Sequence, residues 1–330
     1  MNIVFLSRLN RYLEKELEHL REKHPQVSFF TDYHHTEDED HKKSLLQKAD
    51  AVVAGRITEE QLEQAPNLKV IFVPFVGINP LPLDAIRERG IIVSNAHGNA
   101  EVTAEKALAL AMATLGRIVF FHNDLAQGYW HRSFNTEDLW ESMYEKNFGI
   151  MGMGHIGTAL ARHLKPYNTR ITGYRRNTDQ PIPEPFDEQV QDPETLVEKS
   201  DVIFVCLPLT RYTRHLIDEK LLRKMEERYL INIGRGDIID EAPFYQVLKE
   251  GVLKGAGIDV WYNYPTKDKP EPVFPSQYPF HELENVVLSP HKASHATTAI
   301  KGNARKTAEN IGSFIEKGEP ASLVDFEGRY

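Results

Sequence analysis

Two side chains suited to anion binding and acid–base chemistry follow apolar segments in the second half of the chain. Arg235 lies between two glycines in LINIGRGDIIDE, and His291 follows a proline in LSPHKAS. A guanidinium with this much room can hold both oxygens of a carboxylate, and a histidine exchanges a proton near neutral pH. Each alone is more typical of a structural role. If both segments are strands of one parallel sheet, however, the two side chains lie at the carboxyl ends of its strands, where such sheets bind ligands.

A glycine pattern in the same half of the chain is typical of dinucleotide binding. GIMGMGHIG supplies Gly152, Gly154 and Gly157, with an apolar strand before them and an expected helix Thr158–Leu164 after them. This spacing permits a tight turn, lets a pyrophosphate approach the backbone and packs helix on strand, with the anion at the helix N-terminus. His155 and Ile156, between the last two glycines, belong to the same predicted cofactor site.

The end of the next expected strand bears on the choice of dinucleotide. ITGYRRN has Arg175 and Arg176 where an NAD site usually has Asp or Glu for the ribose 2′-hydroxyl. Two guanidiniums suit a 2′-phosphate, with which they form charge-assisted bonds; otherwise they are solvated arginines at a strand end. The pattern therefore favours NADP(H), with NAD(H) possible.

The elements that must position these residues begin in the first third of the chain, where short apolar runs alternate with helical ones. The expected strands are NIVFL, VSFF, AVVAG, KVIFVPF and IIVSN, and the expected helices are Arg11–Lys23, KKSLLQKA, TEEQLEQA and Pro82–Arg89. Such alternation predicts parallel strands joined by crossover helices. Residues 98–127 then predict one long helix, whose part Ala104–Leu115 is apolar nearly all round and should be buried on several sides.

A second alternating set starts at FGIMGMGHIG. Its further strands are RITGY, DVIFVCL, YLINIG, GAGIDV and VVLSP, and a last helix is expected at Ala296–Lys317. The two sets predict an α/β fold class with two doubly wound parallel-sheet domains, a Rossmann dinucleotide-binding domain and a flavodoxin-like one.

Length and charge exclude several classes of protein. The chain has 330 residues, which suits two domains, and its net charge of −9 argues against nucleic-acid binding. The single cysteine excludes an intramolecular disulfide. No apolar run is long enough for a membrane span or a signal peptide, so we expect no membrane partner and a cytoplasmic location. The tract YHHTEDEDH is typical of a solvated loop, and no metal site is expected.

Taken together, these motifs resemble the D-isomer-specific 2-hydroxyacid dehydrogenases over nearly the full chain. The matching segments are GIMGMGHIG, DVIFVCLPLTRYTRHLI, LINIGRGDIIDE, GAGIDVW and LSPH, and FVGINPLPLDAIRERGIIVSNAHGNAEVTAE is similar to the family's substrate loop and hinge. The resemblance implies a substrate domain of residues 1–97 and 296–330, a dinucleotide-binding domain of residues 98–295 that carries the dimerisation helix, a cleft between the domains and a homodimer.

The resemblance also implies roles for single residues. Arg235 would hold the carboxylate of a 2-keto or 2-hydroxy acid, and His291 would be the general acid in reduction and the base in oxidation. Val76 and Gly77 would offer backbone N–H groups to that carboxylate, and Asn99 and Thr103 would lie near the nicotinamide. The remaining residues implied to line the dinucleotide, with Arg235 and His291, are Leu207, Pro208, Thr213, Ile233, Gly234 and Asp259.

The chain departs from the family's pattern at one catalytic position. The family usually has a glutamate five residues after the Asp of DV, and here that residue is Tyr264. A neutral phenol stabilises an imidazolium much less than a carboxylate does. Three hypotheses follow: a 2-keto acid reductase, of the glyoxylate or hydroxypyruvate type, with a modified acid–base pair; a formate-dehydrogenase-like enzyme that needs no proton relay; or a dinucleotide-sensing protein of corepressor type. The first is preferred.

Overall fold

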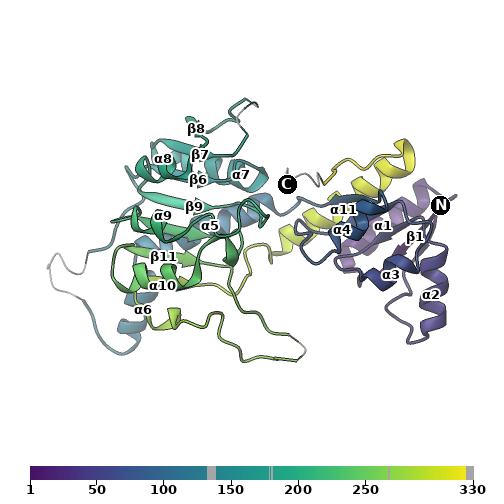
Figure 1. The fold of residues 1–330 in the computed structure, drawn as a ribbon, viewed down its shortest axis with the longest axis horizontal. Coiled ribbons are helices and arrows are strands. Elements are labelled where there is room, and N and C mark those ends of the chain that lie inside the picture. Colours follow the sequence, from purple (N-terminus) through teal and green to yellow (C-terminus); the bar gives the residue numbers. More distant parts are fainter. Residues whose placement is uncertain (132–138, 178, 180, 267, 325–330) are drawn as a thin grey trace. The chain divides into compact units, whose positions relative to one another are not determined.

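A computed structural model describes residues 1–131, 139–177, 179, 181–266 and 268–324, and the chain forms two compact units (Figure 1). Unit 1 combines Met1–Asn99 with His295–Tyr330, and unit 2 is Ala100–Ser294. The expected first domain included residues 325–330, which lie outside the described residues. No helix among the described residues is long and apolar enough to cross a membrane.

Unit 1 is built on a five-stranded parallel sheet in the order β2-β1-β3-β4-β5. Its strands are β1 Asn2–Phe5, β2 Ser28–Phe30, β3 Ala51–Val53, β4 Val70–Val73 and β5 Ile92–Asn95, and its helices are α1 Arg11–Lys23, α2 Glu39–Gln47, α3 Glu59–Glu63, α4 Leu83–Glu88 and α11 Thr297–Lys317. Successive strand residues point to opposite faces, so two apolar clusters form, and α1 and α11 belong to the same cluster. This strand order is flavodoxin-like, as predicted.

Unit 2 is built on a seven-stranded parallel sheet in the order β12-β11-β10-β9-β6-β7-β8. Its strands are β6 Phe148–Met151, β7 Ile171–Tyr174, β8 Glu188–Val190, β9 Val202–Val205, β10 Tyr229–Asn232, β11 Gly255–Ile258 and β12 Val286–Leu288. Its helices are α5 Ala100–Leu115, α6 Ile118–Ala126, α7 His155–Leu164, α8 Pro193–Glu198, α9 Glu219–Arg223 and α10 Glu241–Lys249, with 3₁₀ turns at Lys165–Tyr167, Gly236–Ile238 and Phe280–Glu282. The strand order reverses between β6 and β9, where doubly wound sheets of this kind bind dinucleotides.

The prediction of one helix over residues 98–127 is wrong. The chain forms α5 and α6 instead, and Arg117 between them has φ 48°, a left-handed conformation that interrupts helical hydrogen bonding. α5 packs on α7 and on β10–β12, while its residues Ala109 and Met112 are exposed in the single chain. α7 begins at His155, three residues before the expected Thr158.

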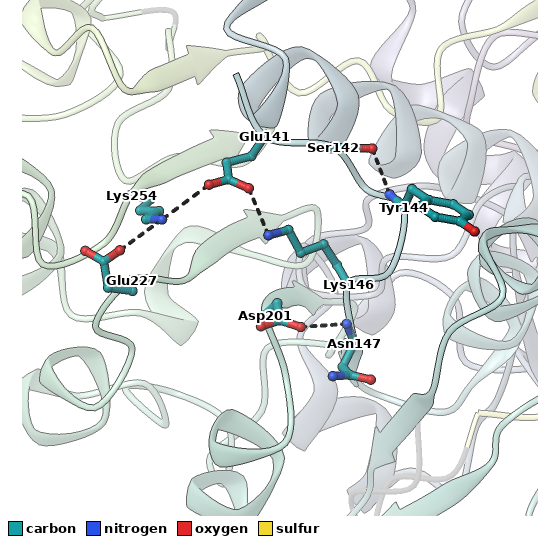
Figure 2. A network of polar contacts seen from close by, with 8 residues as sticks. All are labelled: Glu141, Ser142, Tyr144, Lys146, Asn147, Asp201, Glu227 and Lys254. Carbon is teal, nitrogen blue, oxygen red and sulfur yellow. Dashed lines mark hydrogen bonds and ion pairs between the residues drawn. The ribbon is translucent and has the colours of Figure 1, made fainter. Parts of the chain in front are cut away.

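Within unit 2, polar contacts hold the segment that precedes β6 against neighbouring residues (Figure 2). Lys254, just before β11, lies between Glu141 at 3.4 Å and Glu227 at 2.9 Å, and Glu141 also pairs with Lys146 at 2.8 Å. The backbone N–H of Asn147 donates to Asp201 at 2.7 Å. The segment from Glu141 to Asn147 is thereby fastened next to β6 although it contains no regular element.

Candidate active site

Three adjacent strands of unit 2 bring the predicted catalytic residues to one edge of the sheet. β10, β11 and β12 are parallel neighbours, and their carboxyl ends therefore lie side by side. Arg235 follows β10 by three residues, His291 follows β12 by three, and Tyr264 lies on the chain that leaves β11. The sheet order thus brings Arg235, Tyr264 and His291 to the same end of three neighbouring strands.

The loop that carries Arg235 is held by a buried side chain of β10. The Asn232 side chain accepts a hydrogen bond from the Gly234 N–H at 3.0 Å and donates to the Arg235 carbonyl at 3.1 Å. A Cβ on Gly236 would lie 2.3 Å from the Trp261 carbonyl oxygen, so glycine is required where the loop meets the chain after β11. The Arg235 guanidinium, partly exposed, donates to the Gly234 carbonyl at 2.6 Å.

His291 lies in a turn organised by Asp259. The His291 backbone has φ 53°, in the left-handed region that is uncommon for a residue with a Cβ. The fully buried Asp259 carboxylate accepts hydrogen bonds from the Ser289 hydroxyl at 2.5 Å and from the N–H groups of Lys292 and Ala293, each at 2.9 Å. These bonds hold the turn on both sides of His291. Asp259, predicted to line the dinucleotide, thus has three internal partners.

Tyr264 lies against His291. The two ring centroids are 5.5 Å apart with an interplanar angle of 56°, and the Tyr264 hydroxyl accepts the Trp261 N–H at 3.0 Å. Burial raises the pKa of the Tyr264 phenol, while the Trp261 N–H and the positive charge of Arg235 act in the opposite direction. The phenol is therefore neutral near pH 7, and it contacts the imidazole without a charge of its own.

The glycine loop after β6 fits a dinucleotide. Gly152 has φ 108°, and a Cβ on Gly157 would lie 1.9 Å from the Gly152 carbonyl oxygen, so both glycines are required by the turn itself. A Cβ on Gly154 would meet nothing within 4 Å, so packing within the protein does not explain that glycine. Gly154 is the N-cap of α7 and makes no side-chain cap. Open space before an uncapped helix N-terminus suits a pyrophosphate.

Arginines gather at the ends of the strands on either side of β6. Arg175 follows β7 and donates from Nη2 to the Pro181 carbonyl at 2.8 Å, and the Arg176 guanidinium lies 3.9 Å from the centre of the Tyr212 ring. Tyr212 belongs to the turn after β9 and also contacts Arg211. Arg176, one of the predicted pair at the end of β7, therefore contacts a residue that follows a second strand, β9.

The remaining predicted residues divide between the two units. Leu207 and Pro208 follow β9, where the Thr213 hydroxyl donates to the Pro208 carbonyl at 2.6 Å and closes the turn, and Ile233 is buried after β10. Thr103 is buried in α5. In unit 1, Val76 and Gly77 follow β4, and Asn99 is buried at the end of the first of the two chain segments that form the unit.

Sequence reasoning missed three residues of this region. Asn232 interrupts the apolar strand YLIN, and a buried amide in such a strand is a signal for a loop-holding hydrogen bond. Arg211 and Tyr212 stand in the matched segment DVIFVCLPLTRYTRHLI but carry no local signal of their contact with Arg176.

In the tract YHHTEDEDH, His41 contacts Asp32 at 2.7 Å, and no group of three metal-ligating side chains occurs among the described residues.

Comparison with known proteins finds a family model, related sequences and solved structures that match most of the chain. Residues 108–293 match the family model described as D-isomer specific 2-hydroxyacid dehydrogenase, NAD binding domain. A glyoxylate reductase of Thermofilum pendens is 33% identical over 283 residues, covering 84% of this chain and 80% of that protein. The structure of the PH0520 protein of Pyrococcus horikoshii is 30% identical with a TM-score of 0.81, covering 99% of this chain and 95% of that one.

A further solved structure shares the fold at lower identity. It is the NADPH-dependent glyoxylate/hydroxypyruvate reductase of Sinorhizobium meliloti, in complex with NADP and malonate. It is 24% identical to this chain with a TM-score of 0.76, and the match covers 98% of this chain and 96% of the other. At this identity the likeness concerns the fold alone.

Proposed function

The chain belongs to the D-isomer specific 2-hydroxyacid dehydrogenase family, and we propose that Arg235, His291 and Tyr264 form the active site of its NAD(P)-dependent reduction of a small 2-keto acid such as glyoxylate. The observation that carries the proposal is the order β12-β11-β10, which brings these three side chains to adjoining strand ends. The product is the 2-hydroxy acid, and the reverse reaction oxidises it.

The charges of Arg235 and His291 determine their proposed roles in the reaction. The Arg235 guanidinium binds the substrate carboxylate and, because it is positive, also stabilises the charge that develops on the keto oxygen. His291, protonated, donates its proton to that oxygen as C2 is reduced, and neutral His291 takes the proton back in oxidation. When bound, the nicotinamide supplies the hydride. The turn held by Asp259 orients the imidazole for both directions.

Tyr264 modifies this acid–base step. Its ring lies against the His291 ring, and the Trp261 N–H fixes its oxygen. It therefore orients the imidazole without the electrostatic stabilisation of imidazolium that a glutamate offers. Less of the protonated histidine exists at neutral pH, so reduction should weaken at a lower pH than in an enzyme that has the glutamate.

Unit 2 is the proposed dinucleotide-binding unit. Gly152, Gly154 and Gly157 with the N-terminus of α7 would hold the pyrophosphate, and Arg175 and Arg176 would hold the 2′-phosphate of NADP(H). NAD(H) would bind through the remaining contacts, with lower affinity. The family resemblance also implies a role for Val76 and Gly77, whose backbone N–H groups would bind the substrate carboxylate.

A homodimer is proposed from exposed apolar side chains of unit 2. Met112 of α5, Ile118 and Leu125 of α6, and Trp140, just before Glu141, are each at least 40% exposed. Met112, Ile118 and Trp140 also line one cavity of about 360 Å³, together with Leu115 and Met143. Clustered apolar exposure of this kind is typical of protein interfaces. A second copy of the chain is the proposed partner.

The activity assay follows the oxidation of NADPH and NADH with a panel of glyoxylate, hydroxypyruvate, pyruvate and bulkier 2-keto acids. The proposal expects turnover with at least one small acid, and no turnover with either dinucleotide contradicts it. Formate with NAD(P)⁺ is the parallel arm, because formate oxidation needs no proton relay. Dinucleotide binding without any turnover would instead favour the sensing hypothesis.

A further inference from the structure

The turn after β9 carries a second arginine–aromatic contact toward the end of β7. Tyr212 is 45% exposed, and its ring centre lies 3.9 Å from the Arg176 guanidinium and 4.6 Å from that of Arg211. Arg211 also donates from Nη2 to the Tyr212 hydroxyl at 2.5 Å. One aromatic ring thus holds two cations that come from different loops, residues 175–176 and residues 210–213.

Sheet order places these loops on both sides of the glycine loop. β6 pairs with β7 on one side and with β9 on the other, so the turns after β7 and β9 flank Gly152–Gly157. Hydrogen bonds within the β9 turn make it a defined structure: the Thr210 N–H donates to the Thr213 hydroxyl at 2.8 Å, and the Thr213 N–H donates to the Thr210 carbonyl at 3.2 Å. Arg211 and Tyr212 are therefore presented from an ordered turn.

The charge at this place contrasts with the rest of the molecule. The protein has a net charge of −9, and Arg214, on the same turn, is paired with Asp237 at 2.5 Å. Arg211, by contrast, has no carboxylate within 4 Å among the residues that the structure describes. Guanidiniums that share one ring repel each other, and a bound anion would turn that repulsion into attraction.

We infer that Arg211 and Tyr212 complete a clamp, with Arg175 and Arg176, for the 2′-phosphate of the dinucleotide. Arg211 contributes a guanidinium, and Tyr212 is a positioning residue that holds Arg176 and Arg211 in place through its ring, which reduces the ordering cost of binding. A phosphate monoester has enough oxygens for several forked cations, whereas a 2′-hydroxyl offers them no charge. The inference rests on the proposed function and names the residues that set its cofactor selectivity.

Binding of 2′,5′-ADP and 5′-AMP to the full-length protein, measured by calorimetry, isolates the 2′-phosphate from catalysis. Arg211→Ala should raise the Kd of 2′,5′-ADP roughly tenfold, because a charge-assisted bond is lost, and leave that of 5′-AMP unchanged. Tyr212→Leu should raise the 2′,5′-ADP value roughly threefold, and Tyr212→Phe, which keeps the ring, should restore most of the affinity. NADPH and NADH titrations with the same variants should give the same ratios.

Arg223→Ala is the matched control, because it removes one positive charge from α9, where Arg223 is paired with Glu219 and Glu250. Its Kd values should equal those of the wild type. Equal weakening of both fragments by Arg211→Ala, or no weakening of either, would overturn the clamp. If only the Arg175/Arg176 double variant loses selectivity, the clamp fails while the NADP(H) preference stands. A wild type that binds both fragments equally would overturn clamp and preference together, and turnover of 2-keto acids with NADH would still test the reductase.

Discussion

Tyr264 and Tyr212 lie beyond different strands of the same sheet, and their neighbours differ in kind. The two are similarly exposed, at 42% and 45%, and each hydroxyl oxygen accepts one hydrogen bond. The ring of Tyr264, however, faces the imidazole of His291, whereas the ring of Tyr212 faces two guanidiniums. We therefore propose that the same residue type supports proton transfer beside His291 and anion binding beside Arg176, and that the neighbours decide which.

The two regions also differ in how they are built. The turn of His291 depends on the fully buried Asp259, while the arginines around Tyr212 rest on exposed contacts. Buried charged hydrogen bonds are costly to break, and exposed cation–π contacts are worth much less. Loss of the Asp259 carboxylate should therefore reduce rate or stability strongly, whereas changes near Tyr212 should alter selectivity alone.

The largest effect is expected at Arg235. Arg235→Ala should lower kcat/KM for 2-keto acid reduction by about 10³-fold, because the substrate carboxylate and the developing oxyanion lose their cation. The affinity for 2′,5′-ADP should not change. Steady-state kinetics and calorimetry check the two statements, with Arg235→Lys as the variant that keeps the charge and loses the fork. Retained activity in Arg235→Ala would place the carboxylate site elsewhere.

Asp259→Asn should have the next largest effect. An amide in place of the buried carboxylate turns accepted charge-assisted bonds into weaker or mismatched ones, at a cost of about 2 kcal/mol in the free energy of unfolding. The kcat should fall with it, because His291 loses its fixed turn. Ser289→Ala, which removes one donor to Asp259 and leaves the N–H groups of Lys292 and Ala293, is the graded control. Urea unfolding measures the stability, and equal stability in all three proteins would contradict this account of the turn.

The double variant Arg175→Ala/Arg176→Ala tests the region of Tyr212. The KM for NADPH should rise about tenfold more than the KM for NADH, since only NADPH has the 2′-phosphate that these cations bind. The kcat at saturating NADPH should stay near the wild-type value. An equal rise for both dinucleotides would remove the case for NADP(H) preference and would leave the His291 region unaffected.

The smallest effect is expected from Tyr264→Glu. A carboxylate beside His291 stabilises imidazolium and raises the pKa of the histidine, and reduction requires the protonated form. The falling limb of the kcat/KM profile for reduction should therefore move to higher pH by about one unit, with little change on the acidic side. The wild-type limb should not report Tyr264, because burial raises the pKa of that phenol. Tyr264→Gln, a neutral replacement, should leave the limb where it is; a profile that Tyr264→Glu does not move would show that His291 is tuned by other groups.

Much of the architecture was predictable because most strands and helices have a short, regular pattern of apolar residues. The helix Arg11–Lys23 was predicted with its observed bounds, and the apolar runs AVVAG, KVIFVPF and DVIFVCL contain β3, β4 and β9. β8, Glu188–Val190, was missed since three residues of mixed polarity carry little periodic signal. The break at Arg117 was also missed, because the apolar pattern continues across it and only the backbone conformation reveals the turn.

The sequence alone determined the strand–turn–helix of Gly152–Gly157 and the placement of Arg235 and His291 after strands, because these depend on spacing within a few residues. The tertiary structure decided which side chains contact one another. Asp259 holds residues 30 to 34 positions away, and Tyr212 contacts Arg176 across β6. Such contacts follow from the order in which parallel strands pair, which local periodicity does not encode. The same physical reason gives Tyr264 and Tyr212 different neighbours.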